Sequence, residues 1–190
     1  MNKSSTIHIR NATVADFVSI RQIAYETWPL TFGSILSEAQ ISYMLEMMYS
    51  DSSLSKQVKE LGHRFIIIDS IIDSINESEV SACGYASFQT NYGERGECKV
   101  HKIYVLPAFQ GKGLGKMLLD ELRTIAISEN QVSLLLNVNR DNKAISFYEK
   151  YGFKIFSEED IDIGDGFYMN DYKMKMNLGV LPHEAHLFSN

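Results

Sequence analysis

The strongest limit on the fold comes from a glycine-rich turn that lies between an expected strand and an expected helix. Residues 102–119 read KIYVLPAFQGKGLGKMLL, an apolar β-branched run followed by glycines and then by leucines at helical spacing. Gly111, Gly113 and Gly115 allow the backbone to approach a ligand closely. The free amides at the start of the following helix suit an anion such as pyrophosphate. Two lysines add positive charge to this turn: Lys112 and Lys116.

Two common nucleotide-binding motifs do not fit this turn. A P-loop needs Ser or Thr after its Gly-Lys pair, but Lys116 is followed by Met117. A Rossmann fingerprint reads G-x-G-x-x-G, whereas these glycines are spaced two and two. The turn therefore predicts a phosphate-bearing ligand and leaves its identity to the rest of the chain.

Length and charge exclude several classes of protein. The 190 residues, 45% of them hydrophobic, fit one domain of ordinary size. The net charge of −6 argues against nucleic acid or an anionic membrane as the main partner and favours a cationic substrate. Cys83 and Cys98 form no CxxC motif, no signal-like segment opens the chain, and no apolar run could span a bilayer. We expect a cytoplasmic protein.

Periodicity predicts a mixed, largely antiparallel sheet with helices. Helices are expected after Thr13, with Pro29 ending the first, after Ser37 and near Asp51. Two more should follow the glycine-rich turn and residues 139–142. Gly84 is expected to weaken its strand or mark a bulge, and 158–166 to form a loop. The expected strands cover 6–10, 65–68, 82–90, 97–106, 132–138, 153–157 and 167–177.

Two segments resemble the GCN5-related N-acetyltransferases (GNAT). The turn resembles the Q/R-x-x-G-x-G/A loop that holds the pyrophosphate of acetyl-coenzyme A, and residues 134–154, LLLNVNRDNKAISFYEKYGFK, resemble the N-x-x-N-x-x-A-x-x-F-Y-x-k-x-G-F segment that follows it. The resemblance implies an α/β (α+β) fold with a twisted, mostly antiparallel sheet of about seven strands, splayed between the fourth and fifth, and four to five helices. It implies one acetyltransferase domain over 1–178, with 179–190 as a tail or dimer arm.

The resemblance also implies a set of coenzyme-binding residues. The backbones of Ile103, Tyr104 and Val105 are expected to bond the pantetheine arm. Asn139 is expected to pair with the pantetheine amides, and Asn142 either does the same or caps a helix, the cap being favoured. The pyrophosphate cradle would comprise Gln110, Gly111, Lys112, Gly113, Leu114, Gly115 and Lys116.

The catalytic groups are less well defined. Tyr148 stands where the family places a phenol near the coenzyme sulfur, although a core aromatic is the alternative. Lys99 occupies a strand position that is often acidic in the family, which puts a glutamate base there in doubt. His101, expected to share a face with Ile103 and Val105, could serve as base or head of a water relay. Two fallback bases are Glu26 and Glu97.

A weaker resemblance, to bacterial polyamine (spermidine/spermine, diamine) acetyltransferases, concerns the acceptor. It involves residues 26–32, the IYV before the turn and FYM at 167–169. It implies Glu26 and Trp28 in the acceptor site, and the acidic residues of 158–171 would suit a polycation, although most of them fit a solvated loop. The alternatives are a protein or peptide acetyltransferase, an antibiotic or amino-acid acetyltransferase, and a non-catalytic acyl-CoA-binding protein. A homodimer is compatible with the pattern, and the scattered histidines predict no metal site.

Overall fold

A seven-stranded sheet organises the described residues, which are 5–73, 78–93 and 96–179 of this computed structural model. The strand order is β1-β2-β3-β4-β5-β7-β6, and every neighbouring pair is antiparallel except β4 and β5. The predicted mixed sheet is therefore confirmed. The strands are β1 Ser5–Asn11, β2 Arg64–Asp73, β3 Ser78–Tyr92, β4 Glu97–Val105, β5 Ser133–Asn139, β6 Lys154–Gly164 and β7 Phe167–Asn177.

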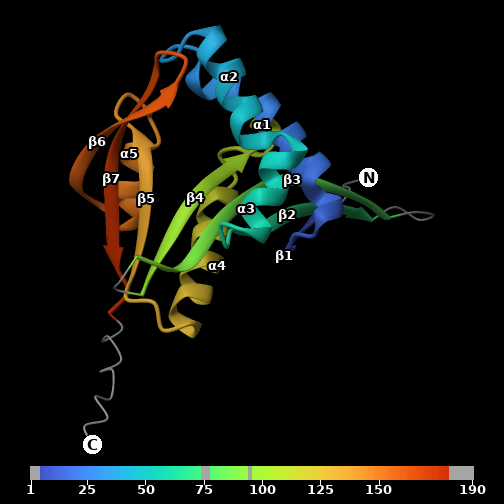
Figure 1. The fold of residues 1–190 in the computed structure, drawn as a ribbon. Coiled ribbons are helices and arrows are strands. Elements are labelled where there is room, and N and C mark those ends of the chain that lie inside the picture. The colour runs from blue at the N-terminus through green and yellow to red at the C-terminus, as the bar shows by residue number, and fades with distance from the viewer. Residues whose placement is uncertain (1–4, 74–77, 94–95, 180–190) are drawn as a thin grey trace, which may run out of the picture.

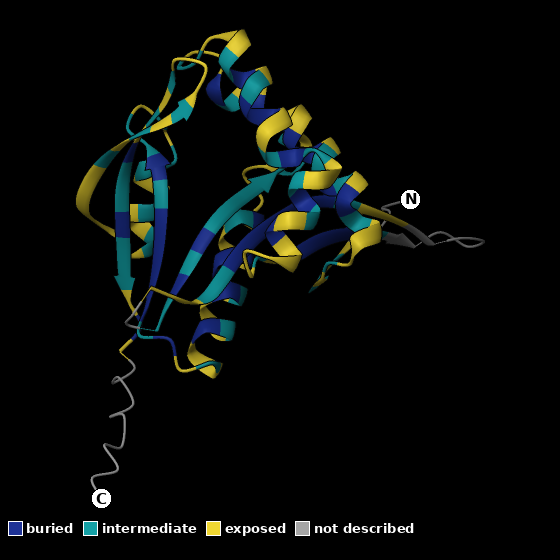
Figure 2. Ribbon diagram, in the orientation of Figure 1, coloured by how far each residue is buried: buried dark blue, intermediate teal, exposed yellow. Residues whose placement is uncertain are grey.

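Helices cover both faces of the sheet and divide its core into two parts (Figure 1). One core lies between α1, α2, α3 and β2–β4, and the other lies under α4 and α5. Figure 2 shows the buried faces of the central strands between these helices. The helices are α1 Phe17–Phe32, α2 Glu38–Tyr49, α3 Asp51–Lys59, α4 Leu114–Ser128 and α5 Ile145–Tyr151, with short 3₁₀ turns at Val14–Asp16 and Pro107–Phe109.

The sheet splays open between β4 and β5, as predicted. The two strands pair only from Cys98 to Val100 on β4, opposite Leu134 to Leu136 on β5. Residues 103–105 of β4 therefore pair with β3 and have no partner on the β5 side. Backbone groups without a partner strand are ready-made hydrogen-bonding sites for an extended ligand.

Close approach of β4 to β3 explains a glycine in β3. A Cβ on Gly84 would lie 2.9 Å from the carbonyl oxygen of Tyr104 and 2.8 Å from Cγ2 of Ile68. The register of β2 and β3 shifts beside Gly84, with Cys83 as the extra residue. The expectation of a bulge at this glycine is confirmed.

The first helix does not end at Pro29, contrary to the expectation. Proline removes one hydrogen bond, to the carbonyl of Tyr25 on the solvent-exposed side of the helix. Trp28 and Phe32 are both buried and their rings pack 4.9 Å apart, which holds the last turn against the sheet. Core packing therefore outweighs the missing bond.

The expected loop over 158–166 is also wrong, because β6 continues to Gly164 and pairs with β7. This strand forms the edge of the sheet and is largely solvent-exposed, so it lacks the apolar alternation that marks a half-buried strand. Ion pairs hold it instead: Lys173 with Glu159 at 3.0 Å, and Arg140 with Glu158 at 3.8 Å.

The described residues contain neither a membrane-spanning helix nor a cluster of metal-binding side chains. None of their helices combines the length and apolarity needed to cross a membrane. Nor do three or more His, Cys, Asp or Glu side chains of this part of the chain gather where they could share a metal ion. The expected tail or dimer arm lies outside the described residues beyond Gly179.

Candidate active site

Two cavities meet at the splay of the sheet. The first, here the central pocket, lies among α1, α2, the free end of β4, the end of β5, and β7. The second, here the loop cavity, lies between residues 109–116 and α5. Both are lined by Ile103, Val105, Gln110, Ala144 and Tyr148. The free edge of β4 and the Tyr148 side chain therefore stand where one cavity passes into the other.

The glycine-rich turn forms one wall of the loop cavity. Gly113 has φ +83° and directly precedes α4, and Gly111 has φ +74°. A Cβ on either would meet no atom within 4 Å, so backbone conformation, and not crowding, requires glycine here. The first amides of α4 have no acceptor within the helix, and buried Leu114 anchors the helix start. This geometry suits a bound anion, as the sequence predicted.

The two lysines of the turn are exposed. Lys112 Nζ lies 4.9 Å from the centre of the Phe109 ring, and Lys116 pairs with Asp120 at 2.7 Å. The charge of Lys116 is therefore partly compensated by Asp120, so Lys112 is the lysine of the turn that is more available to a bound anion.

The free end of β4 runs from the turn toward the central pocket. Tyr104 faces the central pocket, and Gln110 Nε2 donates a hydrogen bond to the Val105 carbonyl at 3.0 Å. This contact ties the turn to the strand edge. An extended ligand along Ile103–Val105 would thus continue directly from an anion held by the turn.

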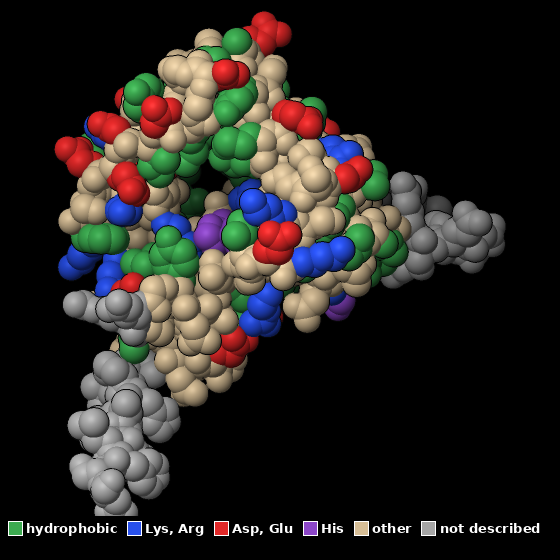
Figure 3. Space-filling model, in the orientation of Figure 1, with side chains coloured by type: hydrophobic (Ala, Val, Ile, Leu, Met, Phe, Trp, Pro, Cys, Tyr) green, Lys and Arg blue, Asp and Glu red, His purple; other side chains and the backbone are tan. Residues whose placement is uncertain are grey.

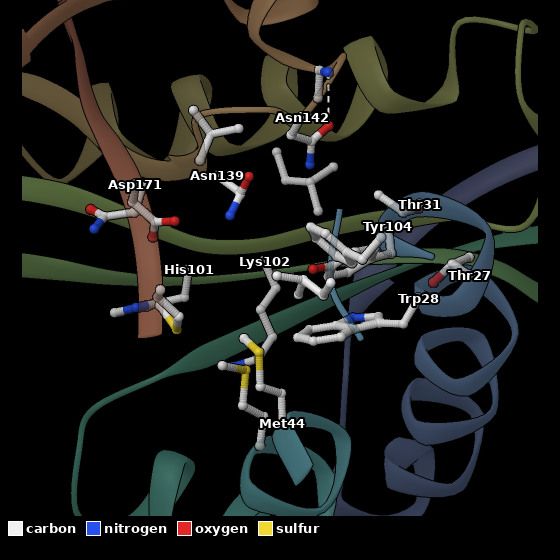
Figure 4. A pocket seen from close by; sticks show the side chains of 18 of the residues that line it. Thr27, Trp28, Thr31, Met44, His101, Lys102, Tyr104, Asn139, Asn142 and Asp171 are labelled. Atoms are coloured by element: carbon white, nitrogen blue, oxygen red, sulfur yellow. Dashed lines mark hydrogen bonds between the residues drawn. The ribbon is translucent and has the colours of Figure 1, made fainter. Parts of the chain in front are cut away.

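The two predicted asparagines follow β5 at the opposite side of the splay. Asn139 Oδ1 accepts from the Asp141 amide at 3.0 Å, and Asn142 Oδ1 accepts from the Ala144 amide at 2.8 Å. Asn142 thus stabilises the turn before α5, but the residue that caps this helix is Ala144, so the favoured role of Asn142 as the helix cap is not supported. Both side chains line the central pocket, and their amide NH₂ groups stay available to a ligand (Figure 4).

Tyr148 lies on α5, packs its ring against other aromatic residues and lines both cavities. The ring meets Phe153 edge-on at 5.9 Å and Phe147 at 5.3 Å. Burial raises the pKa of Tyr148 to about 12. The phenol therefore stays protonated at neutral pH and can donate a proton or a hydrogen bond into the splay.

His101 lies at a bulge, which overturns its expected orientation. Ser87 pairs with Lys102 and Phe88 with Val100, so His101 is the extra residue of β4. Its ring stacks on His63 at 3.8 Å, and the residue lines the central pocket. Burial, and next the charge of His63, lower the pKa of His101 to about 2. A group with this pKa is a poor proton acceptor at neutral pH, so the structure disfavours the predicted base.

Neither fallback base reaches the central pocket. Glu26 is exposed on α1 and is absent from the pocket lining, so its expected place in the acceptor site is not supported. Helical geometry turns Glu26 outward while Thr27, Trp28 and Thr31 face in. Glu97 lies at the far end of β4 and pairs with Lys175 at 2.6 Å.

Aromatic and methionine side chains form the wall toward α1 and α2. Trp28 is 2% exposed, lines the pocket, and packs against Tyr104 at 6.0 Å. It is thus both part of the core and part of the pocket wall. Met44 and Met48 add apolar side chains to the same wall. Figure 3 shows the hollow, with hydrophobic side chains on its upper rim and a histidine and basic side chains below.

Two charged residues of the pocket have no counterpart in the site predicted from sequence. Lys102 extends toward Met44 (Figure 4), donates a hydrogen bond to Gln57 Oε1 at 2.6 Å, and has its pKa lowered by burial to about 8. Asp171, on β7, is 5% exposed. It is the one carboxylate among the described residues that line this pocket. The period-two pattern of 167–177 could have indicated its place in the pocket, because this pattern puts Asp171 on the same face of the strand as Met169.

Comparisons with known proteins agree with this geometry. Residues 63–155 match the model of a family described as "Acetyltransferase (GNAT) domain". A spermidine N(1)-acetyltransferase of Thermoplasma acidophilum is 27% identical over 167 residues, which cover 84% of this chain and 94% of that protein. The peptidyl-lysine N-acetyltransferase YjaB of Salmonella typhimurium is 36% identical over 61 residues, 32% of this chain and 39% of that protein.

A solved structure shares the fold over most of the chain. The PaiA N-acetyltransferase of Thermoplasma acidophilum, crystallised with coenzyme A, superposes with a TM-score of 0.70 at 24% identity, covering 90% of this chain and 99% of that one. The domain match includes β4, the glycine-rich turn, the two asparagines and Tyr148. The domain match, the similarity to curated N-acetyltransferases and the shared fold together support a GNAT-type N-acetyltransferase that uses acetyl-CoA.

Proposed function

We propose that this enzyme acetylates a primary amine of a small molecule by direct attack on the thioester, without an acetyl-enzyme. The observation that carries the proposal is the meeting of the two cavities at Tyr148 and the free edge of β4. Acetyl-CoA supplies an activated acetyl group there when it is bound. The turn amides would hold its pyrophosphate, and residues 103–105 and Asn139 its pantetheine arm. The Tyr148 phenol would protonate the departing sulfur.

Both cysteines support direct attack. Cys83 and Cys98 are the two cysteines of the sequence, and each is fully buried away from both cavities. Burial raises the pKa of Cys83 to about 11 and that of Cys98 to about 12, so neither carries a reactive thiolate at neutral pH. The absence of a reactive cysteine at the site supports direct attack by the amine on the acetyl carbon.

A bridge over the central pocket favours a small acceptor over a protein chain. Gln40 Nε2 donates to the Tyr168 carbonyl at 2.7 Å, and the Tyr43 hydroxyl donates to the Ile163 carbonyl at 2.6 Å. The Tyr43 ring also packs on Phe167 at 5.4 Å. These contacts join α2 to the β6–β7 hairpin beside the pocket (Figure 1) and narrow the approach for a polypeptide. The similarity to a spermidine acetyltransferase supports a polyamine among small amines, and the shorter similarity to a peptidyl-lysine acetyltransferase supports the alternative.

An acceptor panel tests the proposal. The protein is incubated with acetyl-CoA and putrescine, spermidine, spermine, single amino acids, or peptides with a free N-terminus or lysine. Release of free thiol is followed by absorbance, and acetylated product is identified by mass. We expect turnover of small amines to exceed that of peptides. Faster turnover of peptides would contradict the small-acceptor proposal, and turnover of spermidine no better than of unrelated amines would contradict its polyamine form.

A further inference from the structure

The central pocket is lined by one buried carboxylate, that of Asp171, among the described residues. Asp171 lies on β7 directly opposite Asn139 on β5 and is nine-tenths buried. Other acidic residues of the same hairpin differ from it. Glu158, Asp160, Asp162 and Asp165 are exposed, and Glu159 pairs with Lys173. Asp171 alone of this group is directed into the pocket, beside Asn139 and His101 (Figure 4).

The cations near Asp171 are engaged by other partners. Lys99, on β4, hydrogen-bonds the Asn137 side chain, and Lys173, on β7, pairs with Glu159 at 3.0 Å. Arg140, after β5, bonds Asp160 on β6. On β4, His101 is held neutral by its lowered pKa, and Lys102 bonds Gln57. The Asp171 carboxylate is thus buried beside the acceptor space, and no lysine or arginine of the described residues forms an ion pair with it. This arrangement is costly, and a cationic ligand would relieve it.

An amine acceptor is such a ligand and also needs a proton acceptor. Alkyl amines have pKa values of about 10 and are mostly ammonium ions at neutral pH, which cannot attack a carbonyl carbon. Burial raises the pKa of Asp171, while Asn137 and Lys99 oppose this shift in part. A carboxylate with a raised pKa takes a proton more readily. His101 is a poor proton acceptor because its pKa is lowered, and Glu26 and Glu97 do not line the pocket.

We propose that Asp171 binds the ammonium group of the acceptor and accepts its proton before attack. The proton passes from nitrogen to a carboxylate oxygen, which leaves a neutral amine and a neutral carboxyl group. The nitrogen lone pair then forms the C–N bond as the C–S bond breaks. Tyr148 gives its proton to the sulfur, which leaves as a thiol, and the second amine proton restores the Tyr148 phenol. Asp171 then releases its proton to water. This assignment deepens the proposed function and rests on it.

The test compares Asp171→Asn with Asp165→Asn, a matched change at an exposed position of the same hairpin. The acceptor is the amine turned over fastest in the panel. We expect Asp171→Asn to lower kcat/KM for the amine by about 10²–10⁴ at pH 7 and to leave the KM for acetyl-CoA within about twofold. Asp165→Asn should match the wild type. Asp171→Glu, which keeps the carboxylate, should recover part of the rate.

A second readout separates proton acceptance from a structural role. Ethylamine is mostly an ammonium ion at pH 8, whereas 2,2,2-trifluoroethylamine is already neutral. The loss caused by Asp171→Asn should therefore be at least tenfold smaller for trifluoroethylamine. An equal loss for both amines, or no loss for either, would overturn the assignment. If wild-type protein acetylates no amine at all, the proposed function fails and this assignment falls with it; if the wild type is active and Asp171→Asn is equally active, only the assignment fails.

Discussion

Replacing Tyr148 by phenylalanine should separate proton donation from packing. The change removes one oxygen and keeps the ring against Phe147 and Phe153. Tyr148 lines both cavities, and among the described residues its hydroxyl has no hydrogen-bond partner. Its removal should therefore cost well under ~1 kcal/mol of folding free energy. Loss of a positioned acid should lower kcat by about 10²–10⁴, a barrier increase of roughly 3–5 kcal/mol.

The assay is steady-state thiol release with saturating amine, combined with calorimetric binding of coenzyme A. We expect the large fall in kcat with coenzyme A affinity changed by less than about threefold. Tyr151→Phe is the matched control, because Tyr151 lies one turn further along α5 and its hydroxyl donates to Asp120 at 2.8 Å, outside both cavities. That control should lose a little stability and keep its kcat. An unchanged kcat for Tyr148→Phe would refute the assigned role.

Three further predictions concern the turn, the acid limb of stability and a buried lysine. Gly113→Ala should cost about 1–2 kcal/mol of stability and raise the KM for acetyl-CoA, whereas Gly166→Ala, at a similar φ of +75°, should cost the same and leave that KM unchanged. Arg10 lowers the pKa of Asp16 from 3.8 to about 2, so the Arg10–Asp16 pair should add about 1–2 kcal/mol to the unfolding free energy above pH 4 and lose this contribution toward pH 2. In urea unfolding, Asp16→Asn should therefore be less stable than the wild type at pH 6 and equally stable near pH 2. Burial lowers the pKa of Lys102 from 10.5 to about 8, so the unfolded chain binds a proton at Lys102 that the folded protein does not bind between these pH values. The unfolding free energy of the wild type should therefore rise relative to that of Lys102→Met between pH 8 and 10.5. A difference that does not change with pH would contradict this.

Local patterns carried most of the fold and the coenzyme side of the site. Strand periodicity and the glycine-rich turn predicted the order of elements, and the family resemblance of the turn and of the segment 134–154 implied the splay between β4 and β5. These features depend on neighbours in the chain, because a tight turn needs particular backbone angles and a buried strand needs apolar residues. The placement of Asn142 and of Gly84 follows from the same kind of local requirement.

The acceptor side depended on contacts between distant segments. Strict alternation misplaced His101, because the extra residue of a bulge is set by the register of β4 against β3. Asp171 was grouped with an acidic run, although pairing of β7 with β5 turns this one carboxylate inward. Glu26 was placed in the pocket from a short motif, but the rotation of α1, fixed by burial of Trp28, turns it to solvent. Each outcome is decided by tertiary packing, which short-range patterns do not contain.

A crystal structure of the protein with coenzyme A would show whether the splay of β4 and β5 joins a coenzyme cavity to an acceptor pocket. We expect the pyrophosphate on the amides of residues 111–116 and the pantetheine arm along Ile103–Val105. The sulfur should lie about 3–3.5 Å from the Tyr148 hydroxyl. Coenzyme A bound away from the splay, or with its sulfur beyond the reach of Tyr148, would contradict this expectation.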